Sequence, residues 1–351
     1  MLAELAGFED ADLNVFLPVA GLLLGALFGA VAQASRFCLR SAIVGSGASG
    51  LSPMAGAWAL ALLAALGGAQ ALGYLGFVDF AETRFVSETL PLGALVLGGL
   101  MFGAGMVLTR GCASRLTVLT AQGNLRALTV LTVFAITAYM TLRGLLAAPR
   151  LAFTEATSLA VDAGSAVLPV AGAAALVALL GLAVWRSGVS LRLGLAGVAV
   201  GLIVAGGWFA TGALLADPFD PRPAESLAFT SGASDALFYA MASTALEPGF
   251  GAAMVGGVLA GAFVSALARR ELRLESFVAP NQTVRYLSGA VLMGIGGVMA
   301  GGCTIGAGLT GLSTLAVAPL VALVSIVAGA VLAHALLDRH GTVGAMVVPA
   351  E

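Results

Sequence analysis

The sequence has few charged residues and no lysine at all. Only 10% of its 351 residues are charged, whereas 60% are hydrophobic. A soluble domain carries roughly 25% charged residues, so this chain lacks the polar side chains needed to cover a water-exposed surface. No long polar stretch interrupts the sequence, which leaves no room for a separate soluble domain. The composition therefore indicates a membrane protein.

Strict alternation of polar and apolar residues is also missing. Only helices or a closed barrel can span a bilayer, and the runs of Ala, Leu, Val and Gly lack the period of two that is typical of barrel strands. We therefore predict an all-α polytopic membrane protein with about nine transmembrane helices, supplemented by short re-entrant helices. A single transmembrane domain is expected to comprise residues 1–351.

Several motifs with known chemistry are absent. Residues 1–14 contain acids but no basic residue, so no cleaved signal peptide is expected. The three cysteines are far apart and form no CxxC pair, which gives little support to a disulfide framework or a zinc site. No GxxxxGK[ST] loop points to a nucleotide-driven pump. We predict no cofactor, no bound metal and no nucleic-acid partner.

Nine apolar runs are long enough to cross a bilayer. The predicted spans are 14–34, 53–75, 91–109, 124–143, 165–185, 191–215, 249–268, 284–300 and 317–337. Three shorter segments, at 37–48, 112–121 and 303–315, are rich in small and hydroxyl-bearing residues and are predicted to be re-entrant or half helices. A fourth candidate lies at 225–245. The tryptophans Trp58, Trp185 and Trp208 are scattered, and we expect them to face lipid or the membrane interface.

Counting spans from the N-terminus divides the arginines between two sides. One side holds Arg36, Arg40, Arg110, Arg115, Arg126, Arg186, Arg192, Arg269, Arg270, Arg273, Arg285 and Arg339. The other side holds Arg84, Arg143, Arg150 and Arg222, together with most of the acidic residues. Because arginine-rich loops mark the cytoplasm, we predict an N-terminus outside and a C-terminus inside. The expected location is the inner membrane of a bacterium.

Two segments of the chain resemble one another. GLMFGAGMVLTRGC at 99–112 aligns with AVLMGIGGVMAGGC at 290–303, so that three glycines and Cys112 meet three glycines and Cys303. A weaker match relates residues within 18–30 to residues within 193–205, so that Gly21 meets Gly197 and Gly25 meets Gly201. The matches outline two half repeats, 14–143 and 191–337, separated by a linker helix at 165–185. Equivalent helices are five spans apart, so the halves would have opposite orientations, an arrangement found in transporters.

All three cysteines stand where an apolar helix meets small residues and a short polar segment. The motifs are ASRFCLR at 34–40, LTRGCASRL at 108–116 and AGGCTIGAGLTG at 300–311. A helix broken at such a point leaves backbone N–H groups that can bind an anion. A thiol adds a soft, weak hydrogen-bond donor. We therefore take Cys38, Cys112 and Cys303 as candidate transport residues, with Cys112 and Cys303 facing each other near the midplane.

Neighbouring residues complete the candidate site. Arg110 stands where the other half has Gly301, and an arginine near membrane depth is usually paired or functional. Gly111 and Gly302 directly precede their cysteines, and Thr304 can donate a hydrogen bond or cap a helix. For Arg36, Arg40 and Arg126, topology markers of the cytoplasmic side are the simpler interpretation.

At these motifs the sequence resembles the YeeE/YedE family, a sulphur-transport family that includes bacterial thiosulfate transporters. SRFC at 35–38, RGC at 110–112 and GGCTIGAGLTG at 301–311 carry the resemblance. It implies short helices that meet inside the membrane and three thiols, here Cys38, Cys112 and Cys303, that pass a thiosulfate-like anion by hydrogen bonds. The repeat leaves room for a fourth cysteine, where this chain offers Thr230, Ser231 and Ser234. A related sulfur anion or a selenium species therefore stays open as the substrate.

Two other functions are compatible with the sequence. A membrane-bound thiol or sulfur-transfer enzyme would need a cysteine that cycles covalently, and the missing CxxC and the lack of a nearby histidine argue against it. A non-transporting partner of a soluble sulfur-carrier protein could use the loop at 268–276 for docking. A basic loop that sets the topology is the better interpretation of that segment.

Overall fold

The computed structural model describes residues 10–45, 50–87, 89–160, 166–215, 223–277 and 280–339. Within these ranges nine segments are long and apolar enough to cross a membrane, and all nine correspond to predicted spans. The long helices are α2 (Asp10–Ser35), α4 (Pro53–Tyr74), α5 (Leu92–Leu108), α7 (Leu125–Arg143), α9 (Val170–Ser187), α10 (Leu191–Phe209), α12 (Phe250–Ala268), α13 (Pro280–Met299) and α14 (Val317–Arg339). The predicted all-α polytopic fold is therefore confirmed.

Short elements lie at the breaks between the long helices. They are α3 (Leu39–Val44), α6 (Ala113–Ala121), α8 (Ala147–Ala156), the π-helix η1 (Ala210–Leu214), α11 (Phe229–Ala242), the π-helix η2 (Thr304–Gly311) and the 3-10 helix η3 (Leu312–Thr314). The sequence predicted α3, α6, η2 and α11 but not α8. Two short strands, β1 (Thr89–Leu90) and β2 (Leu159–Ala160), pair antiparallel beside α8. Part of the predicted segment 37–48 lies outside the described residues.

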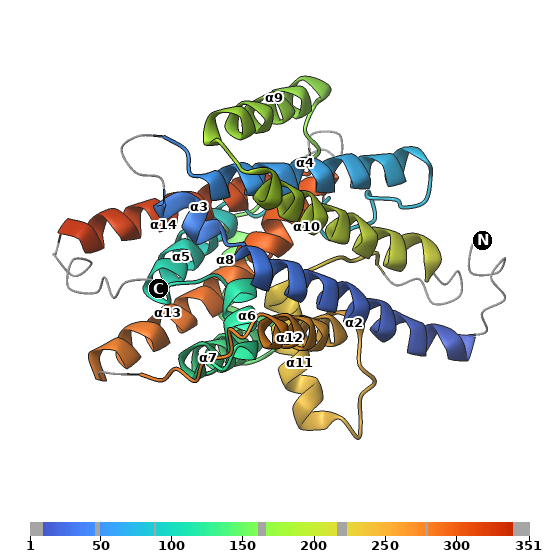
Figure 1. Ribbon diagram of the computed structural model, residues 1–351. Helices are drawn as coiled ribbons and strands as arrows, with labels where there is room; N and C mark the ends of the chain where they lie inside the picture. The colour runs from blue at the N-terminus through green and yellow to red at the C-terminus, as the bar shows by residue number, and fades with distance from the viewer. Residues whose placement is uncertain are drawn as a thin grey trace.

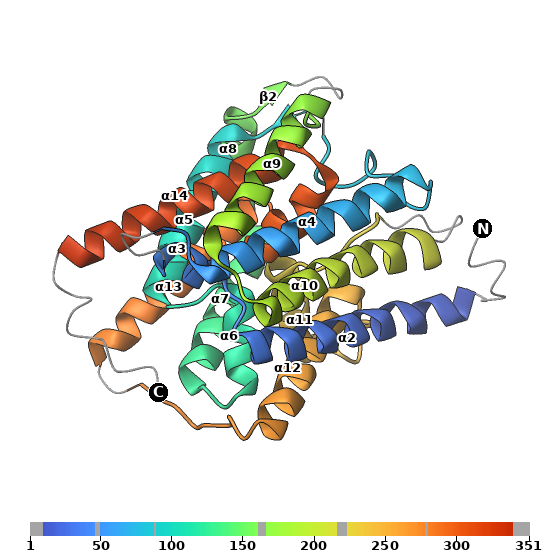
Figure 2. The ribbon, with the colours of Figure 1, turned by 45° about the horizontal axis from the view of Figure 1, so that its top comes forward.

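The bundle places the short helices inside and one long helix at the edge. Figures 1 and 2 show α9 lying outermost, against α4. Only 6% of its most apolar stretch is buried within the protein, so much of this helix is left open to contact with lipid. In contrast, α6 contacts α2, α7 and α12 and is enclosed by them (Figure 1). The broken segments are therefore shielded from lipid, as irregular backbone at membrane depth requires.

Close packing of the long helices depends on glycines at matching places in the two halves. Helix α2 packs on α12, and a Cβ at Gly25 would lie 2.1 Å from the carbonyl oxygen of Met254. Helix α10 packs on α4 in the same way, and a Cβ at Gly201 would lie 2.2 Å from the carbonyl oxygen of Ala61. Gly25 and Gly201 are the residues that the weak sequence match aligned, so that match reflects equivalent packing.

Helices α5 and α13, which carry the stronger sequence match, pack directly on each other. A Cβ at Gly98 would lie 2.8 Å from the carbonyl oxygen of Gly296, and one at Gly105 would lie 2.5 Å from that of Gly289. The contact positions advance from Gly98 to Gly105 along α5 but go back from Gly296 to Gly289 along α13. The two equivalent helices are therefore antiparallel. This arrangement supports the prediction that the two halves have opposite orientations.

The prediction for the tryptophans is wrong for two of the three. Trp185 is 80% exposed, as expected, but Trp208 is 0% and Trp58 only 5% exposed. The indole N–H of Trp208 donates to the hydroxyl of Ser313 at 3.0 Å, and Trp58 stacks on Phe37 beside Cys38. An interior built from glycine and alanine leaves spaces next to the broken helices, and the large aromatic rings fill them.

Candidate functional site

Each cysteine follows a break with the same backbone geometry. Two residues before the thiol, Arg36, Arg110 and Gly301 have φ values of 53°, 60° and 71°. A left-handed residue ends a helix, and here it turns the chain so that the cysteine becomes the N-cap of the next short helix, α3, α6 or η2. The sequence match of Arg110 with Gly301 therefore corresponds to the same conformation in both halves.

Cys38 and Cys112 form a thiol pair. The two side chains lie close enough to interact with each other, and only 4% and 1% of their respective surfaces are exposed. The Cys112 sulfur also lies 3.2 Å from the hydroxyl of Ser114. Cys112 thus meets the cysteine of its own half, and the prediction that Cys112 and Cys303 face each other near the midplane stays a prediction.

Arginines surround this pair. Arg40 and Arg115 both interact electrostatically with Cys38. The Nε atom of Arg40 and one terminal nitrogen of Arg115 are buried without a hydrogen-bond partner. Arg110 lies within electrostatic range of Arg40, although its own side chain keeps an exposed surface. Buried guanidinium donors require an acceptor, so this end of the protein is suited to receive an anion.

Arg126 has a different role from these arginines. Its guanidinium forms an ion pair with Glu275, and the amide of Asn124 donates to the same carboxylate at 2.7 Å. The loop that contains Glu275 is thereby fixed on the turn between α6 and α7, where the backbone of Leu125 also donates to the Glu275 carbonyl at 2.8 Å. The pairing agrees with the prediction that Arg126 lies outside the site.

Cys303 lies at the start of η2, as its N-cap. Its side chain is fully buried, and its sulfur accepts a hydrogen bond from the backbone N–H of Gly306 at 3.3 Å. The next residue, Thr304, is 1% exposed, and its hydroxyl has no hydrogen-bond partner. The π-helical geometry of η2 is rare and is often found at functional sites.

The two glycines before the cysteines differ in what they permit. A Cβ at Gly302 would lie 2.7 Å from the backbone nitrogen of Ala307, so only glycine fits there. At Gly111 the nearest atoms would be 3.6 Å away, an ordinary contact distance. The structure thus explains glycine at position 302 by the lack of space, and it gives no steric reason for glycine at position 111.

Ala228 occupies the place where the repeat leaves room for a fourth cysteine. It is the N-cap of α11, as Cys38 is of α3, and neither side chain makes a capping hydrogen bond. A Cβ at Gly306 would lie 3.5 Å from the Cβ of Ala228 and 3.8 Å from the Cys303 sulfur. The start of α11 therefore packs against the start of η2 beside Cys303. Of the three polar residues predicted for this position, Ser234 is used internally, because its hydroxyl donates to the Thr230 carbonyl at 2.9 Å.

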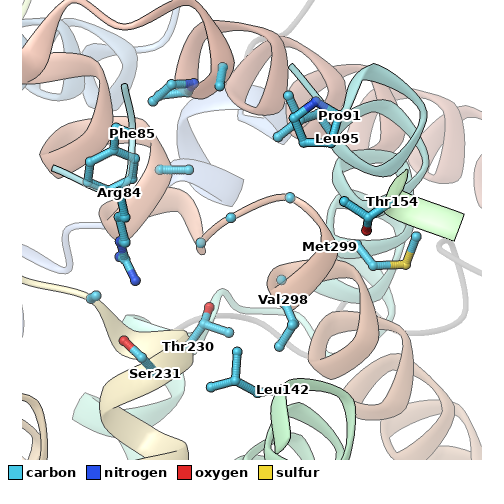
Figure 3. Close-up of a pocket in the computed structure, with 18 of the residues that line it drawn as sticks. Arg84, Phe85, Pro91, Leu95, Leu142, Thr154, Thr230, Ser231, Val298 and Met299 are labelled. Atoms are coloured by element: carbon cyan, nitrogen blue, oxygen red, sulfur yellow. The ribbon is translucent and has the colours of Figure 1, made fainter. Parts of the chain in front are cut away.

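A cavity of about 250 Å³ opens beside these two helix starts. Its lining includes Arg84, Arg150, Thr230, Ser231, Gly301 and Gly302. Figure 3 shows Arg84 reaching toward the part of the wall where Thr230 and Ser231 lie. Because Gly301 and Gly302 belong to this wall, the cavity extends to the backbone next to Cys303.

Both arginines that line the cavity, Arg84 and Arg150, were missed as site residues in the sequence. Arg84 lies in the loop after α4, where its guanidinium is 4.8 Å from the ring centre of Phe85. Arg150 lies on α8 and donates to the carbonyl oxygen of Thr141 at 2.9 Å, at the C-terminal end of α7. Neither residue belongs to a cysteine motif, and only the tertiary fold brings them to Cys303. Both are on the side predicted to be outside.

Comparison with known proteins assigns the family. The sequence profile described as sulphur transport matches residues 34–193 and, a second time, residues 185–332. The chain belongs to the sulphur transport family. The two successive matches meet at the start of α10, where the second half repeat was predicted to begin.

Two relatives are named thiosulfate transporter TsuA. The relative from Escherichia coli K12 is 27% identical over 328 residues, which cover 83% of this chain and 86% of that protein. The relative from Spirochaeta thermophila is 30% identical over 335 residues, which cover 88% of this chain and 96% of that protein. The similarity therefore extends over nearly the full length of both relatives.

Proposed function

We propose that this member of the sulphur transport family takes up thiosulfate, or a closely related sulfur anion, through a narrow path lined by Cys303, Cys112 and Cys38. The observation that carries the proposal is the recurrence of one geometry at all three buried thiols, with an arginine-lined cavity reaching the first of them. The names of the two relatives support thiosulfate as the substrate.

The chemistry of the substrate fits the two kinds of donors. Thiosulfate has hard oxygens, which suit guanidinium and backbone N–H groups, and one soft terminal sulfur, which suits a thiol. In the proposed path the anion enters the cavity at Arg84 and Arg150 and its sulfur meets Cys303. It then passes to the pair of Cys112 and Cys38 and leaves among the arginines around them. Each step exchanges hydrogen bonds and forms no covalent bond.

The proposed direction follows from the distribution of arginines. The thiol pair lies on the arginine-rich side, which marks the cytoplasm, and the cavity lies on the other side. We therefore place the N-terminus outside, the C-terminus inside and the protein in the inner membrane of a bacterium. Of the residues predicted from the sequence, Arg110 would attract the anion at the exit, and Gly111, Gly302 and Thr304 would offer backbone and hydroxyl groups along the path.

A second candidate function is a thiol–disulfide or sulfur-transfer enzyme, and the contact between Cys38 and Cys112 is the observation that favours it. Both thiols are buried, and a catalytic thiol must be reached by its redox partner. The transporter is therefore the better supported function. Mass spectrometry of the protein after exposure to thiosulfate distinguishes the two, because an enzyme would accumulate a persulfide or a mixed disulfide on a cysteine.

Docking of a soluble sulfur-carrier protein at the loop 268–276 stays a prediction. The loop is held on the protein by Glu275, and the side chain of Leu274 is 87% exposed on it. Copurification of the full chain with a soluble thiol protein, lost when Leu274 is changed to Asp, would support this partner.

Uptake by the purified protein in vesicles tests the proposed substrate. Labelled thiosulfate should enter vesicles that contain the protein, and unlabelled thiosulfate should compete more strongly than sulfate, sulfite or selenite. Equal competition by sulfate would contradict the role of a soft terminal sulfur. An absence of uptake would contradict the proposed function itself.

Uptake should also increase as the pH falls. Burial raises the pKa of the Glu225 carboxyl; the positive charge of Arg84 partly offsets this rise, and nearby Asp235 adds to it. Protonation of Glu225 removes a negative charge near Arg84, so the cavity should bind an anion more tightly below the raised pKa of this carboxyl. Changing Glu225 to Gln should raise uptake at neutral pH and flatten its pH dependence.

The matched control for this prediction is Glu82→Gln, which removes an exposed acid from the same loop as Arg84. In this control, the initial uptake rates between pH 5 and 8 should show the same pH dependence as those of the unmodified protein. An unchanged pH profile in Glu225→Gln would show that this carboxylate does not control anion binding.

A further inference from the structure

The hydroxyl of Thr230 is buried and has no hydrogen-bond partner. Its side chain is 5% exposed and lines the cavity. Thr137 and Thr141 on α7, by contrast, each donate to the carbonyl four residues earlier, at 2.8 and 2.7 Å. A buried hydroxyl without a hydrogen-bond partner lowers stability. The Thr230 hydroxyl is therefore expected to gain a partner when the protein binds its substrate. In Figure 3 the Thr230 side chain lies beside Ser231 on the wall that Arg84 approaches.

The first turn of α11, which contains Thr230, also lacks a side-chain cap. Helix α11 has 14 residues, and its N-cap, Ala228, has no side chain that could accept a hydrogen bond. The first helical bond runs from the N–H of Gly232 to the carbonyl of Ala228. The backbone N–H groups of residues 229–231 precede this bond and therefore have no acceptor within the helix. Such groups at a helix N-terminus bind anions, and the helix dipole favours negative charge there.

A positive charge and a soft donor lie on the other sides of the same cavity. Arg84 lines it and interacts electrostatically with Cys303. The packing of Ala228 against η2 puts the start of α11 next to the Cys303 sulfur. One anion in this cavity could therefore meet hard donors at one end and a thiol at the other.

We propose that Thr230 and the uncapped N-terminus of α11 form the binding site for the oxygen atoms of an oxyanion, while Cys303 contacts its terminal sulfur. The inference rests on the proposed function for the identity of the anion. Sulfate would use only the donors of α11 and a sulfide only the thiol, so an anion with both kinds of atoms is bound best. In this arrangement the alanine at position 228 leaves the backbone N–H groups free for the substrate.

Thr230→Val removes the hydroxyl and keeps the shape of the side chain. Thr230→Ser retains the hydroxyl, and Thr154→Val is the matched control, because Thr154 lines the same cavity from α8. The full chain is purified in detergent with sodium thiosulfate as the probe. The increase in melting temperature with thiosulfate reports binding, and uptake into vesicles reports KM and maximal rate.

In Thr230→Val, thiosulfate should no longer raise the melting temperature appreciably, and KM should increase about tenfold, as expected for one lost hydrogen bond to a charged group. The maximal rate should change by less than about twofold. Without thiosulfate this variant should melt at or above the temperature of the unmodified protein, because an unpaired buried hydroxyl is gone. Thr230→Ser and Thr154→Val should behave like the unmodified protein.

Three results would overturn the proposal. The first is a Thr230→Val variant that retains the thiosulfate-induced shift and KM. The second is a lower melting temperature of that variant without ligand, which would show that the hydroxyl is structural. The third is an equal loss in Thr154→Val, which would remove the specific role of Thr230. If the unmodified protein shows neither a shift nor uptake, the proposed function fails instead.

Discussion

Replacing Cys303 with serine should lower thiosulfate uptake by roughly ten- to a hundredfold while the protein stays folded. A hydrogen bond to a charged group contributes about 1.5–3 kcal/mol, and the hard hydroxyl cannot replace the soft thiol toward the terminal sulfur. Serine can still accept the hydrogen bond that the Gly306 N–H donates to the cysteine sulfur at 3.3 Å, since serine is a good N-cap residue. Initial rates in vesicles, at equal amounts of inserted protein, measure the effect.

Cys303→Ala is the companion variant, because it removes the cap as well as the thiol. It should lose as much uptake as Cys303→Ser and also melt at a lower temperature. If Cys303→Ser transports at the normal rate and only Cys303→Ala fails, the role of the residue is to cap η2, and the thiol takes no part in transport.

The second large effect concerns the contact of α12 with α2. Changing Gly257 to Ala should strongly destabilise the protein, because the new Cβ would lie 2.1 Å from the carbonyl oxygen of Leu22. Backbone atoms cannot move aside as a side chain can, and overpacking of this kind costs roughly 1–3 kcal/mol or more. The yield of monodisperse protein after solubilisation and its melting temperature should both fall.

Gly256→Ala is the matched control, one residue away on the same helix. A Cβ at Gly256 would have no atom within 4 Å, and alanine is a better helix former than glycine by up to about 1 kcal/mol. This variant should be as stable as the unmodified protein or more so. Equal stability of Gly257→Ala and Gly256→Ala would contradict the tight packing of α2 on α12.

The long helices and the breaks could be predicted from the sequence because each is encoded locally. A run of about 20 apolar residues is sufficient to identify a span, and glycine or arginine before a cysteine interrupts it. The repeat aligned Arg110 with Gly301, and the positive φ of both residues shows that the aligned positions have an equivalent backbone. The glycine matches also outlined the two halves, although not how their helices pack.

The contacts across the fold could not be predicted in the same way. Sequence similarity aligns Cys112 with Cys303, but similarity between halves says nothing about proximity, and it gave no sign of the contact between Cys112 and Cys38. Arg84 and Arg150 lie in segments without any motif, so only tertiary structure brings them to one cavity. The burial of Trp58 and Trp208 could not be predicted either, because the sequence does not show whether an apolar side chain faces lipid or protein.

The passage of an intact anion past the thiols is the central claim, and labelling the two sulfur atoms of thiosulfate separately tests it most directly. Vesicles containing the purified protein are given thiosulfate labelled either at the terminal sulfur or at the sulfur that bears the oxygens. If the anion crosses intact, both labels should enter at the same initial rate, and neither should remain on the protein. Entry or retention of the terminal label alone would show that a cysteine removes that sulfur, and would contradict transport by hydrogen bonds.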